Sequence, residues 1–162
     1  MRDISQYYSF DEINKMARDD VILAGSLVRF EIIKILMIIP KKVLGYILEN
    51  CLFVILPSEQ KGVFINNKLI DKKNVIVFEE SIDQEPMESK SQIVIHEIAH
   101  HVLNHEPIFE TQNQEDILRI KEERENEANE LAYSWIKDYP GSEEWYLLWG
   151  LTSDRLDSNS NY

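Results

Sequence analysis

Residues 96–105 read HEIAHHVLNH and contain all four histidines of the chain. On an α-helix, residues four apart leave the same face one turn apart, so His96 and His100 present both imidazoles toward one point. Two imidazoles at that spacing can hold a Zn²⁺ ion at about 2.0–2.1 Å. The stretch therefore predicts a helix that carries a zinc site.

Glu97 follows the first of these histidines and lies about 80° round the helix from their shared face. His-Glu-x-x-His is the helix pattern of zinc metallopeptidases, in which the glutamate acts on a metal-bound water as general base. The pattern indicates a hydrolytic site with Glu97 as its catalytic residue.

His101 and His105 form a second pair with a spacing of four, on a different face of the helix. Val102 follows His101, so this pair lacks an adjacent carboxylate that would act as a base. Cations near a helix C-terminus are mildly stabilising, which favours a structural role. The alternative is that His101 and His105 help to position the predicted ligands His96 and His100.

A catalytic zinc usually has three protein ligands, and the third must come from elsewhere in the chain. No histidine remains, and the single cysteine, Cys51, lies far upstream in a predicted strand. The metzincin extension of the motif is absent, since Leu103 and Glu106 occupy its Gly and His positions. These facts predict a carboxylate ligand.

A second long helix, predicted from Asn113 to Asp138, offers five acidic candidates: Glu122, Glu123, Glu125, Glu127 and Glu130. Its apolar side is defined by seven residues: Ile117, Leu118, Ala128, Leu131, Ala132, Trp135 and Ile136. Three of the acids, Glu123, Glu127 and Glu130, point nearly opposite that side and are expected in water.

Glu125 lies at the edge of the apolar side, where a side chain is half-buried and faces a neighbouring helix. We therefore choose Glu125 as the third ligand, with Glu122 as the alternative. Asn129, one turn further along the same edge, is placed to accept a hydrogen bond from the second nitrogen of a ligating histidine. A solvated helix face is the competing interpretation of this glutamate-rich run.

The 162 residues suggest one domain, 1–162, and the composition is that of a globular protein. A net charge of −12 with no basic cluster argues against direct contact with nucleic acid. A lone cysteine fits a reducing cytoplasm, and residues 1–10 lack a secretory signal. The apolar run 21–40 contains Arg29, Glu31 and Lys34, which favours a core helix over a membrane span. Oligomeric state is not indicated.

The remaining pattern predicts an α+β fold. One or two helices fill the region to residue 50, entering at Ser9 and ending or kinking at Pro40. Three short apolar runs, CLFVIL (51–56), GVFI (62–65) and NVIVFEE (74–80), predict a small antiparallel sheet. The histidine helix should run from Pro86 to Pro107. A last short helix begins at Ser142, and residues 153–162 form a frayed tail.

The stretch HEIAHHVLNH, followed by ENEANELA at 125–132, resembles the ImmA/IrrE family of zinc metallopeptidases, which have a zincin fold. The resemblance covers about residues 60–136. It implies that His96, His100 and Glu125 bind zinc, that Glu97 is the catalytic acid and base, and that Asn129 is the family's asparagine one turn after the glutamate. Residues 133–140, YSWIKDYP, depart from the Leu-Leu-Met-Pro-like segment common in the family.

The resemblance also implies a substrate class: a cytosolic DNA-binding repressor of a phage, a mobile element or a stress operon. The expected function is zinc-dependent cleavage of such a repressor, aligned by strand addition to NVIVFEE or GVFI. Tyr133, His101 and His105 are candidates for stabilising the oxyanion. One alternative is a zinc-dependent antirepressor that holds the repressor without cutting it, and another is a metal-free structural protein.

Overall fold

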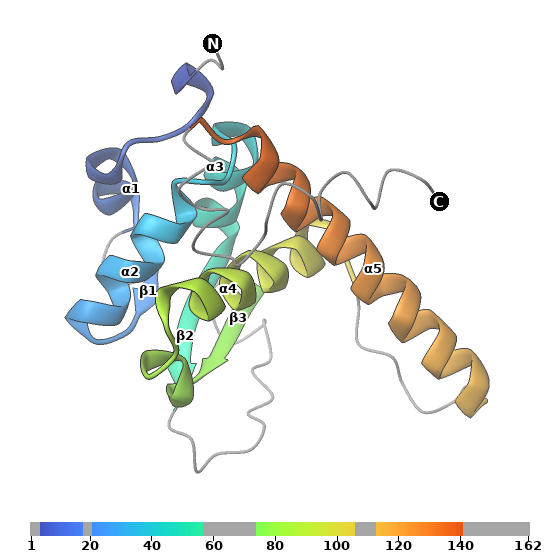
Figure 1. The fold of residues 1–162 in the computed structure, drawn as a ribbon. Helices are drawn as coiled ribbons and strands as arrows, with labels where there is room; N and C mark the ends of the chain where they lie inside the picture. Colours follow the sequence, from blue (N-terminus) through green and yellow to red (C-terminus); the bar gives the residue numbers. More distant parts are fainter. Residues whose placement is uncertain (1–3, 18–20, 57–73, 106–112, 141–162) are drawn as a thin grey trace.

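The computed structural model describes residues 4–17, 21–56, 74–105 and 113–140 (Figure 1). Within these ranges the fold is α+β, with five α-helices and a three-stranded sheet. The predicted α+β class is confirmed, and the zincin fold stays a prediction. The sheet, however, is parallel, so the predicted antiparallel arrangement is wrong.

The chain enters through a 3-10 turn, Ile4–Gln6, and helix α1, Phe10–Met16. Ser9 caps α1 as predicted. Its hydroxyl accepts from the Glu12 amide at 3.4 Å, and the Glu12 carboxylate accepts from the Ser9 amide at 2.7 Å. This capping box satisfies amides that a helix start otherwise leaves unpaired.

The apolar run 21–40 was predicted as one core helix but contains two elements. Ile22–Leu23 is a short strand, β1, and Ser26–Leu36 is helix α2. Gly25 has extended backbone angles at the N-cap of α2, which separates the two. A continuous apolar run suits a buried strand as well as a helix, and periodicity alone does not distinguish them.

Pro40 ends this region, as predicted, by standing at the N-cap of helix α3, Lys41–Asn50. The charges within α2 have partners in the fold. The Arg29 guanidinium donates to Asn14 Oδ1 at 2.8 Å, and Lys34 Nζ lies 4.7 Å from the centroid of the Phe30 ring. Among the helices of the described ranges, none combines the length and hydropathy that a membrane crossing requires.

The sheet has the order β1-β2-β3, with β2 at Cys51–Leu56 and β3 at Asn74–Glu79. Phe53 in the central strand is in register with Ile22 and Ile76. Parallel strands need a long crossover, which α2 and α3 provide between β1 and β2. The residues of the strands suit parallel and antiparallel pairing equally well, so the sequence pattern did not reveal the relative direction of the strands. GVFI (62–65) lies outside the described residues.

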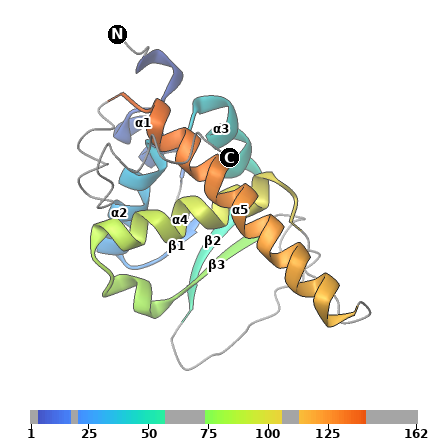
Figure 2. The ribbon, with the colours of Figure 1, turned by 45° about the vertical axis from the view of Figure 1, so that its right-hand side comes forward.

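Helix α4, Met87–Val102, crosses over the sheet in both views (Figures 1 and 2). Pro86 is its N-cap, as predicted, but it ends before the predicted Pro107. Its apolar face joins the core through four buried residues, Val94, Ile95, Ile98 and Ala99, which belong to the same cluster as the strand residues Phe53, Ile76 and Phe78.

Helix α5, Gln114–Asp138, crosses α4, and its N-terminal half extends away from the rest of the chain (Figure 2). Its bounds agree with the prediction. The Asn113 side chain caps it by accepting from the Glu115 amide at 2.7 Å. The C-terminal half is anchored in the core by Ala128, Ala132, Trp135 and Ile136. The predicted last helix at Ser142 and the tail 153–162 lie outside the described residues.

Candidate metal centre

Helix α4 presents two imidazoles at one point. His96 and His100 lie one turn apart, with their Nε2 atoms 2.8 Å from each other. Their rings meet edge to face, at a centroid distance of 4.4 Å and an interplanar angle of 83°. The side chains are 22% and 19% exposed, so both remain accessible from solvent.

Helix α5 brings a carboxylate to the same point. Glu125 Oε2 lies 3.0 Å from His96 Nε2, and Glu125 Oε1 lies 3.4 Å from His100 Nε2. One donor atom from each of the three residues lies within 4.8 Å of the others. The predicted ligands therefore converge. Glu125 is 57% exposed, more than the predicted half-buried edge.

The donor set fits zinc. Ligand atoms about 2.0–2.1 Å from a tetrahedral ion are about 3.3 Å apart, close to the separations in this group. Two neutral imidazoles and one carboxylate are also a ligand set of catalytic zinc sites. The alternative ligand, Glu122, is exposed and stands outside the converging group in the described residues.

The second nitrogen of each imidazole is also engaged. His96 Nδ1 lies 3.0 Å from Asn129 Oδ1, which is the contact that the sequence predicted for Asn129. An amide oxygen only accepts, so Nδ1 carries the proton and Nε2 is left with its lone pair toward the centre. We assign the tautomer of His96 on this basis.

His100 is contacted by His105, for which the sequence favoured a structural role and kept support of the ligand pair as the alternative. His100 Nδ1 lies 2.8 Å from His105 Nδ1, and His105 Nε2 lies 3.0 Å from Glu127 Oε2. The expected pairing of His105 with His101 assumed that the helix continues, but α4 ends at Val102. Glu127 was expected in water and is indeed 62% exposed, yet it contacts His105.

Burial keeps the pKa of His100 below its ordinary value of 6.5, and the charge of His96 lowers it further. Metal binding requires a neutral imidazole, so a lowered pKa favours the ligand form near neutral pH. His101 also has a lowered pKa because of burial. Its ring stacks on Tyr46 at 6.3 Å, and within the described chain its Nε2 has no hydrogen-bond partner.

Glu97 stands beside the centre on α4. Burial raises the pKa of its carboxyl above the ordinary 4.5, although the charge of His96 opposes the increase, and Glu125 adds to it. General bases in enzymes are commonly raised in this way toward the working pH. The environment of Glu97 therefore suits proton transfer.

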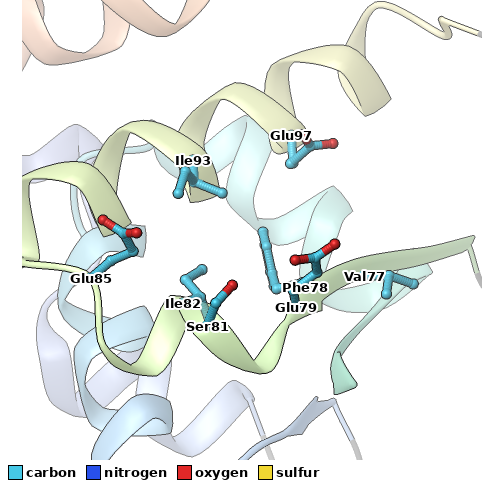
Figure 3. A pocket seen from close by; sticks show the side chains of 8 residues that line it. All are labelled: Val77, Phe78, Glu79, Ser81, Ile82, Glu85, Ile93 and Glu97. Atoms are coloured by element: carbon cyan, nitrogen blue, oxygen red, sulfur yellow. The ribbon is translucent and has the colours of Figure 1, made fainter. Parts of the chain in front are cut away.

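A hollow of about 250 Å³ opens next to Glu97 (Figure 3). Helix α4 faces β3 and the 3-10 turn Glu80–Asp83 across it. Its lining includes the apolar side chains Val77, Phe78, Ile82 and Ile93 and the acidic side chains Glu79, Glu85 and Glu97. The hollow thus extends from strand β3 to Glu97.

No protein-family model, no curated protein and no solved structure matches this chain. The resemblance to the ImmA/IrrE family stays a prediction.

Proposed function

We propose that this protein is a zinc-dependent endopeptidase. The observation that carries the proposal is the convergence of His96, His100 and Glu125 from two helices, with Glu97 beside them. Structural zinc sites usually have four protein ligands, whereas catalytic sites have three and an open position. Three donors and a neighbouring carboxylate are what a hydrolytic site requires.

The three donors would hold the ion, with Asn129 orienting His96. When bound there, zinc supplies a Lewis acid that acidifies water and polarises a carbonyl group. Glu97 takes the proton of the attacking water at its carboxylate and passes it to the leaving amine. Its raised pKa supports both halves of this transfer.

The substrate peptide lies along β3 in this proposal. Within the described residues β3 pairs with β2 only, so its other edge has backbone groups available for an added strand. The hollow follows that edge toward Glu97. An extended peptide on β3 would place its scissile bond near the centre and one side chain in the hollow.

The lining of the hollow favours a long basic side chain. The aliphatic stem of a lysine or arginine would pack on Ile82 and Ile93, and its cationic end would meet Glu79 and Glu85. A net charge of −12 also attracts basic chains at a distance. A DNA-binding repressor in the cytoplasm, the substrate class implied by the family resemblance, is rich in such residues.

The test compares zinc-loaded wild type with Glu97→Gln on a synthetic peptide library, with products identified by mass spectrometry. We expect equal zinc content and a loss of cleavage of about 10²–10⁴-fold in the variant. Equal cleavage by both proteins would reject the role of Glu97. A library left intact by both would contradict the endopeptidase and leave the zinc-dependent antirepressor, which holds a repressor without cutting it.

A further inference from the structure

The position of His105 is fixed by the way α4 ends. Asn104 follows the C-cap residue Leu103 and has φ 54°, in the left-handed region. The amide of His105 donates to His100 O at 3.1 Å, and the amide of Asn104 donates to His101 O at 3.1 Å. These are the two hydrogen bonds of a Schellman motif.

A Schellman motif usually brings an apolar side chain back onto the last turn of the helix. Here the two positions that meet are His105 and His100, and their rings are 5.0 Å apart between centroids. The His105 side chain is only 9% exposed. The helix end therefore places a second imidazole behind a proposed metal ligand.

The hydrogen bonds run in one direction. With Nε2 of His100 toward the metal centre, its Nδ1–H donates to His105 Nδ1, which must then be an acceptor. The proton of a neutral His105 is consequently on Nε2, and it donates to Glu127 Oε2. Both ring nitrogens of His105 therefore have a partner, and this series of hydrogen bonds ends on a carboxylate.

We propose that His105 and Glu127 form a positioning relay for His100. The relay holds the His100 ring in orientation and tautomer and increases the electron density at its metal-binding nitrogen, as carboxylate partners of ligating histidines do. The inference rests on the metal centre of the proposed function. It concerns binding of the ion, and it stands whether or not a peptide is cut.

The two ligating histidines are thus supported unequally. His96 donates to the neutral amide oxygen of Asn129, whereas His100 donates into a chain that ends on a negative charge. Hydrogen bonds to a charged acceptor are roughly twice as strong as neutral ones. On the His100 side, the bond with such a charged acceptor is the outer one, from His105 to Glu127.

A helix cap alone does not explain His105. The capping bond comes from its backbone amide, which any residue other than proline at this position would supply. Glu127, an exposed residue on another helix, has no part in that cap. Replacing either side chain should therefore leave the helix end intact and affect only the relay.

The experiment measures Zn²⁺ affinity by competition with a chromophoric chelator, and the absorption spectrum of bound Co²⁺, for purified full-length variants. We expect His105→Ala to lose about 10–100-fold in affinity and to change the Co²⁺ spectrum. Glu127→Ala should lose less, and Glu127→Gln, which keeps an acceptor oxygen, should recover part of the loss. Glu130→Ala removes an exposed acid from the same helix and serves as the matched control.

The double variant His105→Ala/Glu127→Ala gives the sharpest outcome. Because Glu127 acts through His105, the double loss should equal that of His105→Ala alone. Additive losses, or wild-type affinity in His105→Ala, would overturn the relay. His96→Ala tests the metal centre itself, because it removes a proposed ligand. If this variant bound zinc with wild-type affinity, the metal site of the proposed function would be wrong, and the relay would be rejected with it.

Discussion

The ammonium group of Lys90 in α4 contacts the carboxylate of Glu31 in α2, with Lys90 only 1% exposed. Lys90 Nζ also lies 3.4 Å from the carbonyl oxygen of Asp83. The contact joins helix α2 to α4, the helix that carries both proposed histidine ligands. A buried ammonium needs such partners, because an unpaired charge in the interior is costly.

We expect Glu31→Gln to destabilise the protein by about 2–4 kcal/mol, because it leaves the Lys90 charge buried without its counterion. The double variant Glu31→Leu/Lys90→Met, which removes both charges, should recover most of that loss. Urea unfolding of the metal-free proteins measures both. A double variant as unstable as the single one would show that packing, and not the charge, dominates.

The choice of the third ligand is tested by a pair of variants on α5. Glu125→Ala should reduce zinc from about one ion per chain to a trace, since two imidazoles alone bind weakly. Glu122→Ala removes the same charge one turn earlier and should keep the ion. Elemental analysis of tag-free protein gives the answer. Loss of zinc in Glu122→Ala and retention in Glu125→Ala would reverse the assignment.

The raised pKa of Glu97 makes the stability of the folded protein depend on pH. Its pKa is raised in the folded protein, so its contribution to stability is present below about 4.5 and is lost as pH rises through the folded value. Metal-free Glu97→Gln cannot ionise at this position. Relative to wild type, it should therefore gain stability between about pH 4.5 and about pH 7.

Urea unfolding at the two pH values measures this gain, with Glu130→Gln as the exposed control on α5. A stability difference between Glu97→Gln and wild type that is the same at both pH values would contradict a raised pKa.

The left-handed Asn104 is expected to be sensitive to side-chain shape. Asn104→Val should cost about 1–2 kcal/mol, because a β-branched residue is strained at positive φ, whereas Asn104→Gly should be close to neutral. Thermal unfolding distinguishes the two. Equal stability of the valine and glycine variants would show that this turn adapts to a different backbone.

The acidic residues that line the hollow predict a preference for substrates with a basic side chain. Peptides with lysine at the residue that enters it should be cleaved with higher kcat/KM than leucine analogues. Glu79→Lys should reduce that advantage by about fivefold or more, because it replaces an exposed attractive charge by a repulsive one. A lysine preference that survives unchanged in Glu79→Lys and in Glu85→Lys would exclude the hollow as its source.

Much of the candidate site was predictable because its signals are local. The spacing of His96 and His100 fixes their common face on any helix, and the apolar arc of α5 orients Glu125 and Asn129 toward a neighbour. The capping residue Asn113 likewise defines the start of α5. These features depend on helix geometry, which a few consecutive residues determine.

The features that the sequence did not predict depend on the relative direction of the strands and on a single turn. Ile22–Leu23 is too short to distinguish from the adjacent helix, and strand composition does not reveal whether neighbours run parallel. The contact of His105 with His100 depends on the left-handed conformation of Asn104. The sequence pattern predicted a helix that continues past Val102, so it did not indicate this turn.

The parallel sheet has a consequence for how the chain folds. No strand pair in β1-β2-β3 runs antiparallel, so none can form early as a hairpin with a tight turn. Each pairing must instead close a long loop before its hydrogen bonds contribute, which slows folding. Helices α4 and α5 are local structures, yet the sheet that α4 packs against is expected to form late. The rate at which the candidate metal centre assembles is therefore expected to depend on how fast the sheet forms.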